Sequence, residues 1–286
     1  MSRTSQLETG NSTPMAITAL NSAATGLRAL STRIDVVANN LANAETNGFK
    51  RSKANFEDLL YVTLRQPGTL NANNEVTPAG IQVGLGTKLS NTELDFSEGS
   101  LEETNVPLNV AIEGGTGFFR VKVMDGVGDG YGYTRLGNFF KNKDGELVLG
   151  NRDGYRLDPP ITMPQNVTDD AISVAPDGTV SYTPPGQTNS VIAGNIKLYR
   201  FVNPQGLKAM GSSFYQSTDA SGAALESDPG QDGAGQTRGG YLEGSNVDPV
   251  KELVTLIKTQ RSFELNSQSI QTADQALQTI ANLRRF

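Results

Sequence analysis

Apolar residues recur at every seventh position in two stretches, one near each end of the chain. In the first stretch two such rows run three positions apart, and they consist of Leu20, Leu27, Ile34 and Leu41 and of Ala23, Leu30, Val37 and Ala44. This pattern predicts a helix with one narrow apolar seam that packs against another helix. Asn47-Gly48 follows, and glycine readily takes the left-handed conformation that ends a helix. We expect a long helix over residues 15–47.

The second stretch follows a helix-start signal, Asp248-Pro249, in which Asp caps free amides and Pro fits the first helical turn. Arg284 and Arg285 suit the negative end of that helix. We expect a helical element over residues 242–286, with apolar residues Val250, Val254 and Ile257 widening its first turns. Its predicted interface residues are Leu253, Leu256, Phe263, Ile270, Ala273, Leu277 and Ile280.

The two seams have two interpretations. They can pack on each other inside one ordinary domain. We favour contacts between molecules, because two narrow helices that cover only each other leave much apolar surface exposed. Both seams are therefore predicted to be assembly interfaces, with the two helices paired as a coiled coil.

Between the helices the pattern changes to short strands and turns. Asp144-Gly145, Asp153-Gly154 and Asp177-Gly178 stand at hairpin positions between alternating segments. Residues 101–241 are predicted to form an antiparallel all-β domain, and residues 217–240, rich in Gly, Ser and Asp, a loop within it. The fold class is therefore α+β.

Two other segments are less regular. Residues 48–100 are predicted to form an extended connector, in which the apolar run at 56–64 fits either a strand or a helix. Residues 1–14 are polar and lack periodicity, so we expect disorder there. Met1 and Met15 are both possible translation starts.

Composition narrows the classes of function. The 286 residues contain no Cys and no His, which removes thiol chemistry, the commonest general base and the commonest metal ligand. Residues 52–247 carry fourteen Lys and Arg against twenty-three Asp and Glu, and an acidic middle without a basic stripe argues against nucleic acid. The chain shows neither a membrane-spanning run nor a cleavable secretory leader.

Three patterns with possible chemistry have simpler explanations. A calcium site would use Asp125, Asp129, Asp144, Glu146 and Asp153, but most of these Asp residues precede Gly, as hairpin turns require. GGTGFF at residues 114–119 lacks the Lys-Ser/Thr of a phosphate loop. Paired carboxylates arise by chance among thirty acidic residues. We predict no enzyme activity, no cofactor, no metal and no small-molecule substrate.

Four blocks resemble the flagellar axial proteins, the rod and hook family of the bacterial flagellum. They are ANNLANAETNGFKR (38–51), NVAIEGGTGFF (109–119), YTRLGNFFKNKDGELV (133–148) and the stretch from Tyr241 to Ile280. The motif residues of the first block are Asn39, Asn40, Leu41, Ala42, Asn43, Thr46, Asn47, Gly48 and Phe49. Residues 56–69 resemble a segment of distal rod members, carried by Phe56, Leu59, Leu60, Tyr61, Arg65, Gln66, Pro67 and Gly68. The 125–132 stretch departs from the family pattern.

The resemblance implies a homo-oligomeric helical filament, a tubular drive shaft of the basal body that transmits torque to the hook. Implied partners are proximal rod and hook proteins at its two ends, surrounding ring (bushing) proteins and the type III export apparatus. The implied location is periplasm-spanning, after export without a cleaved signal peptide. Two alternatives stay open: a sibling axial protein (a proximal rod or hook subunit), and a secreted coiled-coil adhesin or hydrolase.

Overall fold

The computed structural model describes residues 12–68, 76, 78–123 and 130–283, without the side chains of residues 12–17 and of Ile280. The described residues form two compact units. The first, called here the helical unit, takes its residues from Met1–Asn39, Ser52–Glu93 and Val250–Phe286. The second, called the β body, comprises Asn40–Arg51 and Leu94–Pro249.

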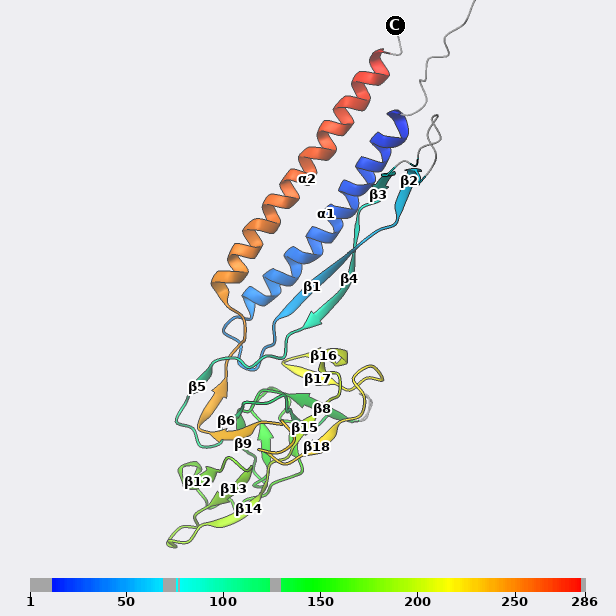
Figure 1. The fold of residues 1–286 in the computed structure, drawn as a ribbon. Helices are drawn as coiled ribbons and strands as arrows, with labels where there is room; N and C mark the ends of the chain where they lie inside the picture. Colours follow the sequence, from blue (N-terminus) through cyan, green and yellow to red (C-terminus); the bar gives the residue numbers. More distant parts are fainter. Residues whose placement is uncertain (1–11, 69–75, 77, 124–129, 284–286) are drawn as a thin grey trace, which may run out of the picture. The chain divides into compact units, whose positions relative to one another are not determined.

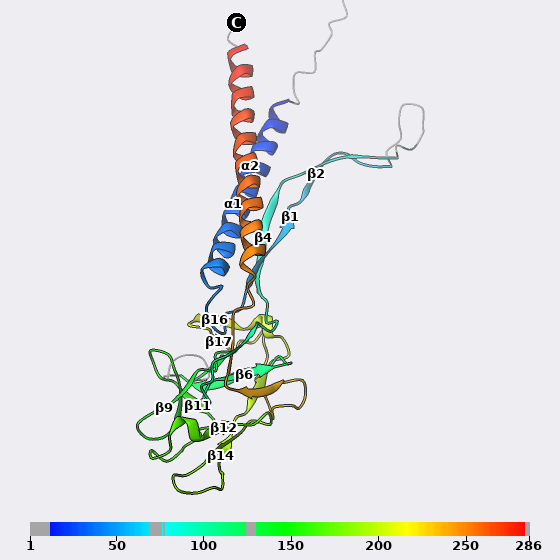
Figure 2. The same ribbon diagram turned by 90° about the vertical axis from the view of Figure 1, so that its left-hand side faces the viewer.

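The helical unit is built on the two long helices, α1 (Ser12–Ala42) and α2 (Pro249–Leu283), which lie side by side in both ribbon views (Figures 1 and 2). Four strands complete it: β1 (Ser52–Asp58), β2 (Tyr61–Arg65), β3 (Ile81–Gly84) and β4 (Thr87–Leu94). β1 pairs with β4, and β2 pairs antiparallel with β3.

The four strands β1–β4, called here the connector strands, are attached to one side of α1 through hydrogen bonds at β3 and β4. The Ser22 hydroxyl donates to the Gly84 carbonyl at 3.3 Å, and the Thr25 hydroxyl accepts from the Thr87 amide at 3.3 Å. Gly86 lies so close that a Cβ built on it would be 2.1 Å from the Thr25 hydroxyl oxygen, and its φ is +110°. Only glycine fits this position without a local shift.

The β body contains a seven-stranded antiparallel sheet in the order β16-β17-β8-β7-β11-β10-β9. Its strands are β7 (Phe119–Lys122), β8 (Tyr131–Thr134), β9 (Phe139–Lys141), β10 (Leu147–Leu149), β11 (Arg156–Asp158), β16 (Lys208–Gly211) and β17 (Phe214–Gln216). A three-stranded sheet joins β12 (Ile172–Val174), β13 (Thr179–Tyr182) and β14 (Val191–Asn195).

Three two-stranded pairs complete the body, and the first two of them bring its end back to its beginning. They pair β5 (Leu101–Glu103) with β20 (Tyr241–Glu243), β6 (Val110–Glu113) with β19 (Gln236–Gly239), and β15 (Leu198–Arg200) with β18 (Leu225–Ser227). Single 3-10 turns occur at Asp169–Ala171 and Pro204–Gly206.

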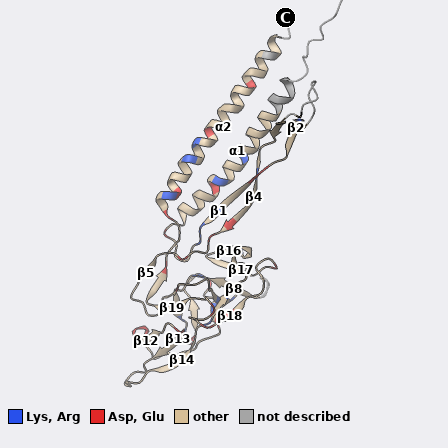
Figure 3. Cartoon of the chain, viewed as in Figure 1, with Lys and Arg blue, Asp and Glu red and all other residues tan. Residues whose placement is uncertain are grey.

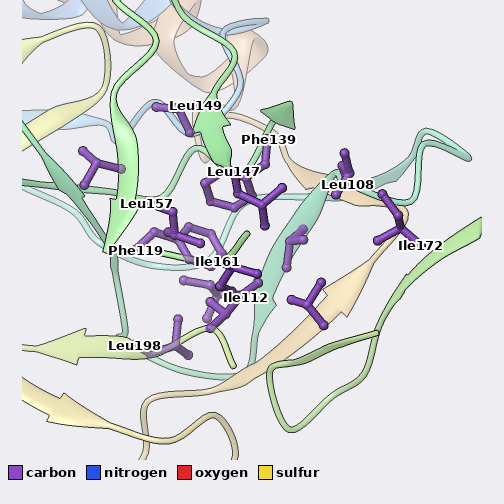
Figure 4. Close-up of a cluster of buried hydrophobic side chains, with 14 of the residues drawn as sticks. Leu108, Ile112, Phe119, Phe139, Leu147, Leu149, Leu157, Ile161, Ile172 and Leu198 are labelled. Atoms are coloured by element: carbon purple, nitrogen blue, oxygen red, sulfur yellow. The ribbon is translucent and has the colours of Figure 1, made fainter. Parts of the chain in front are cut away.

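Both hydrophobic clusters of the described residues lie in the β body. The larger one gathers side chains from several strands, among them Ile112, Phe119, Leu147, Leu157 and Ile161 (Figure 4). The smaller one is aromatic and contains Phe118, Tyr133, Tyr199, Phe201 and Tyr215. In the helical unit, by contrast, the buried apolar residues among those described are Ala29 and Val37.

Several local predictions are confirmed. α2 begins at Pro249, as the Asp248-Pro249 signal indicates. Gly145, Gly154 and Gly178 have φ values of +81°, +60° and +86°, and each lies in the turn between consecutive strands. The ambiguous run at 56–64 contains the end of β1 and most of β2, with Leu59 and Leu60 between the two strands.

Other details differ from the sequence predictions. α1 ends at Ala42 rather than at Asn47, and Gly48, whose φ is +68°, donates its amide to the Glu243 carbonyl at 2.8 Å instead of ending the helix. Residues 217–240 are not a loop throughout, because β18 and β19 find partners in β15 and β6. Residues 242 and 243 belong to β20, so α2 starts seven residues later than residue 242, where the C-terminal helical element was predicted to begin. Arg284 and Arg285 lie outside the described residues.

Candidate assembly interface

The predicted interface residues of the first helix are covered to different degrees. Val37 is buried, and the other α1 members are half-buried, namely Leu20, Ala23, Leu27, Leu30, Ile34 and Leu41. Ala44 lies beyond the end of α1, in the turn that leads to Gly48. Gly26 lies close to α2, since a Cβ built on it would be 3.1 Å from Asn266 Nδ2.

The less exposed side of α2 carries two rows at sevenfold spacing. Leu256, Ile270 and Leu277 of the first row are half-buried, and Phe263 is 36% exposed. The second row is mostly polar: Glu252 and Thr259 are buried, and Asn266 and Ala273 are half-buried. Sequence reasoning identified Ala273 but missed the other three, because a search for apolar residues passes over polar ones. Their spacing of seven from Ala273 is the signal that finds them.

A second apolar face of α2 is exposed. It is called here the outer face and consists of Val250, Leu253, Val254 and Ile257, which are 71%, 48%, 44% and 57% exposed. Leu253, predicted as a seam residue, belongs to this face. The predicted interface residue Ile280 lies in α2, but its side chain is outside the described part of the chain.

Charge is distributed unevenly along α2. Three cations and two Glu residues are interspersed between Lys251 and Glu264, and Asp274 is the single charged residue of the remaining helix as far as Leu283 (Figure 3). The second half of α2 therefore presents mainly Gln, Ser, Thr and Asn to its surroundings. An uncharged polar surface of this kind can approach copies of itself without repulsion between like charges.

The β2–β3 hairpin carries further exposed apolar side chains. All five residues of β2 are exposed, and Leu60, Tyr61 and Leu64 are 83%, 56% and 49% exposed. The hairpin starts where Leu59 donates to the Gly86 carbonyl at 2.9 Å and Leu85 donates to the Leu60 carbonyl at 3.1 Å.

The other residues of the predicted 56–69 segment lie in this hairpin or next to it in sequence. Phe56 is in β1, Arg65 donates to the Ala79 carbonyl at 3.3 Å, and Gly68 has a φ of +80°. Gln66 and Pro67 are exposed.

The family-like motif leads into a tightly built junction within the β body. Asn40 is buried, the Thr46 hydroxyl lies 3.2 Å from Asn43 Oδ1, and the Phe49 amide donates to the Thr46 carbonyl at 3.2 Å. Leu41 and Asn43 are half-buried, whereas Asn39 and Ala42 are exposed. A Cβ on Gly48 would lie 3.0 Å from the Leu136 amide nitrogen, so this close approach also needs glycine.

Residues 48–51 are fixed to residues 243–246 at several points. Besides the Gly48 amide on the Glu243 carbonyl, the Arg51 amide donates to Asn246 Oδ1 at 2.8 Å. Asn246 in turn donates to the Asp95 carbonyl at 2.7 Å. Lys50 reaches Glu243 in the interior, and Arg135 lies beside this pair.

Those acidic residues considered as calcium ligands that the structure describes do not converge in this way. Asp125 and Asp129 lie outside the described residues, and Glu146 forms an ion pair with Arg156 at 3.1 Å. Across the described part of the chain, no group of three or more potential metal-ligating side chains comes together. Over the same residues, no helix is long and apolar enough to cross a membrane.

Three family models match the chain. The model described as flagella basal body rod protein matches residues 20–50, the flagellar hook protein FlgE/F/G D1 domain matches 111–182, and the flagellar basal body rod FlgEFG protein C-terminal model matches 238–283. The flagellar basal-body rod protein FlgG of Buchnera aphidicola subsp. Acyrthosiphon pisum is 43% identical over 91% of this chain and 96% of its own length.

The chain belongs to the FlgG family of flagellar basal-body rod proteins.

Similarity extends to distant members of the FlgG family. The flagellar basal-body rod protein FlgG of Caulobacter vibrioides is 40% identical over 93% of this chain and 99% of its own length. That of Bacillus subtilis is 35% identical over 93% and 98%. The predicted family resemblance is thereby confirmed along nearly the whole chain. Each of the three matched regions contains one of three residues that meet in the interior of the β body, namely Lys50, Arg135 and Glu243.

Proposed function

We propose that this chain is a structural subunit of the distal rod of the bacterial flagellar basal body. Many copies pack helically into a tube that transmits torque from the motor to the hook. Full-length similarity to FlgG proteins supports the rod assignment. The distal position is supported by the resemblance of residues 56–69 to distal rod members, whose described part contains the end of β1 and the exposed strand β2 of the hairpin.

The outer face of α2 is the structural observation that best supports assembly. α2 has one side toward α1 and a second apolar side, the outer face, that the described residues leave exposed. Burying one such side chain contributes about 1.5–3 kcal/mol, so a neighbouring copy that covers several of them gains a stable contact. Such contacts between different surfaces of identical subunits generate helical filaments when they do not close into a ring.

In this proposal α1 and α2 pair through their seams as a coiled coil in the core of the tube. The half-buried seam residues pair α1 with α2 inside one subunit, whereas the outer face, which includes the predicted seam residue Leu253, makes the contact between molecules. The proposed role is mechanical, and no catalytic step is involved. Proposed neighbours are the proximal rod and hook proteins, the ring proteins around the rod, and the type III export apparatus that delivers subunits to the growing end of the periplasm-spanning shaft.

Electron microscopy of basal bodies from cells lacking this gene tests the proposal. We expect structures that stop at a short proximal rod, without hook or outer rings, and that become complete when the gene is restored. Complete rods that lack only a hook would identify the chain as a hook subunit instead. Intact flagella would overturn the proposed role altogether.

A further inference from the structure

Three fully buried charged side chains meet inside the β body. Lys50 Nζ lies 2.5 Å from Glu243 Oε1, and Arg135 NH1 lies 3.6 Å from Glu243 Oε2. The side chains of all three residues have no exposed surface. Because they are covered within one chain, contacts with other subunits do not explain them.

Backbone groups form hydrogen bonds with some, but not all, of the polar atoms of these three side chains. Lys50 Nζ donates to the Ser97 carbonyl at 2.6 Å, and Glu243 Oε1 accepts from the Gly99 amide at 3.0 Å. Arg135 donates to the Gly115 carbonyl at 2.5 Å. Among the described residues, Glu243 Oε2 accepts no hydrogen bond, and Arg135 NH1 donates none. Arg135 and Glu243 therefore interact through charge at 3.6 Å rather than through a hydrogen bond.

The group has two cations and one carboxylate. Burial lowers the pKa of Lys50 and of Arg135, which means that the site penalises both positive charges. Glu243 is the residue whose carboxylate lies within ion-pair distance of both. Asp95 acts on Lys50 and Glu98 acts on Arg135, but without Glu243 neither buried cation would have an ion-pair partner among the described residues, which is strongly destabilising.

The three charged residues come from parts of the chain that are far apart in sequence. Lys50 precedes the strands of the body, Arg135 follows β8, and Glu243 ends β20, the last strand of the body. Lys50 and Glu243 are 193 positions apart. Residues 243–246 also hold the segment that contains Lys50. The Gly48 amide donates to the Glu243 carbonyl, and the Arg51 amide donates to Asn246 Oδ1.

We propose that Lys50, Arg135 and Glu243 form a closure device that makes docking of residues 48–51 conditional on the arrival of β20. Until β20 pairs with β5, Asp95 and Glu98 act on Lys50 and on Arg135 only from beyond ion-pair distance, and the segment stays open. Once Glu243 enters, the two cations are compensated and the segment closes. This inference does not rest on the proposed function, because it concerns a single chain.

Trypsin cleavage after Arg51 in the full-length monomer tests the device, since local opening exposes this peptide bond. The Glu243→Gln variant keeps the shape of the side chain but removes its charge. We expect cleavage after Arg51 to become faster by about tenfold or more while the β body still unfolds cooperatively. Glu113→Gln is the matched control, because Glu113 pairs with Arg238 on the surface and its loss should leave the cleavage rate unchanged.

Removing a cation together with the carboxylate separates charge from shape. In the double variant Lys50→Met with Glu243→Gln the three positions carry a net charge of +1, as they do in the wild type. Cleavage should therefore slow again relative to Glu243→Gln alone. If Glu243→Gln does not fold, a folded and protected double variant supports the device. Wild-type cleavage in Glu243→Gln, or a double variant that is cleaved as fast as or faster than Glu243→Gln, would overturn it, and so would failure of both variants to fold.

Discussion

At the scale of single residues, Ile257 is the side chain on which the assembly proposal can be tested most directly. It is 57% exposed on the outer face of α2. Ile257→Asn should leave the monomer folded but lose about 1.5–3 kcal/mol at each contact between subunits. Because every copy repeats the contact, rods should fail to form and cells should stop swimming.

Polymerisation of the purified variant, followed by sedimentation and electron microscopy, measures this effect. Gln260→Asn, a polar exchange on the same helix, serves as the control and should assemble like the wild type. If Ile257→Asn forms rods at the wild-type protein concentration, the outer face does not join subunits.

At the scale of elements, the β2–β3 hairpin is expected to stiffen the rod by bridging adjacent subunits. A deletion of residues 56–69 would also remove part of β1, which pairs with β4. Deleting residues 61–84 is cleaner, because it joins Leu60 to Leu85, which are already hydrogen bonded at 3.1 Å. We expect this variant to assemble into bendable, hook-like polymers.

Point variants separate the apolar contact from the hairpin itself. Replacing Leu60 and Leu64 by Ser should soften the polymer in the same way, whereas Thr63→Ser should not. Curvature in electron micrographs is the readout. Straight, rigid polymers from the deletion variant would contradict the bridging role.

At the scale of the whole molecule, the two units should differ in stability when the chain is alone. The hydrophobic clusters belong to the β body, whereas the helices bury little and depend on packing for their stability. Heating the dilute monomer should therefore abolish the helical circular dichroism at a lower temperature than the near-ultraviolet signal. That signal reports the body, because seven of the eight tyrosines lie there and Tyr61 alone lies outside.

The same heating experiment on assembled protein provides the comparison with the monomer. In polymerised protein the helical transition should shift upward, because binding to neighbours stabilises the folded helices by mass action. A single coincident transition in the monomer would show that the two units unfold as one.

Local features of this fold follow from the sequence alone. The sevenfold rows around Leu27 and Phe263 predict the two long helices, because helical periodicity is a property of neighbouring residues. The Asp-Gly pairs at 144–145 and 153–154 predict turns for the same reason, since glycine adopts the left-handed conformation that these turns need. The family-like blocks, read from residue order, identify the protein class.

Features that join distant segments depend on the tertiary structure. The Gly-rich stretch at 217–240 contains β18 and β19 only because β15 and β6 offer their edges. Glu252 and Thr259 are buried only because α2 turns that side inward. Lys50 and Glu243 look like ordinary surface charges in the sequence. Their pairing across 193 positions is a long-range contact, and no local periodicity encodes such a contact.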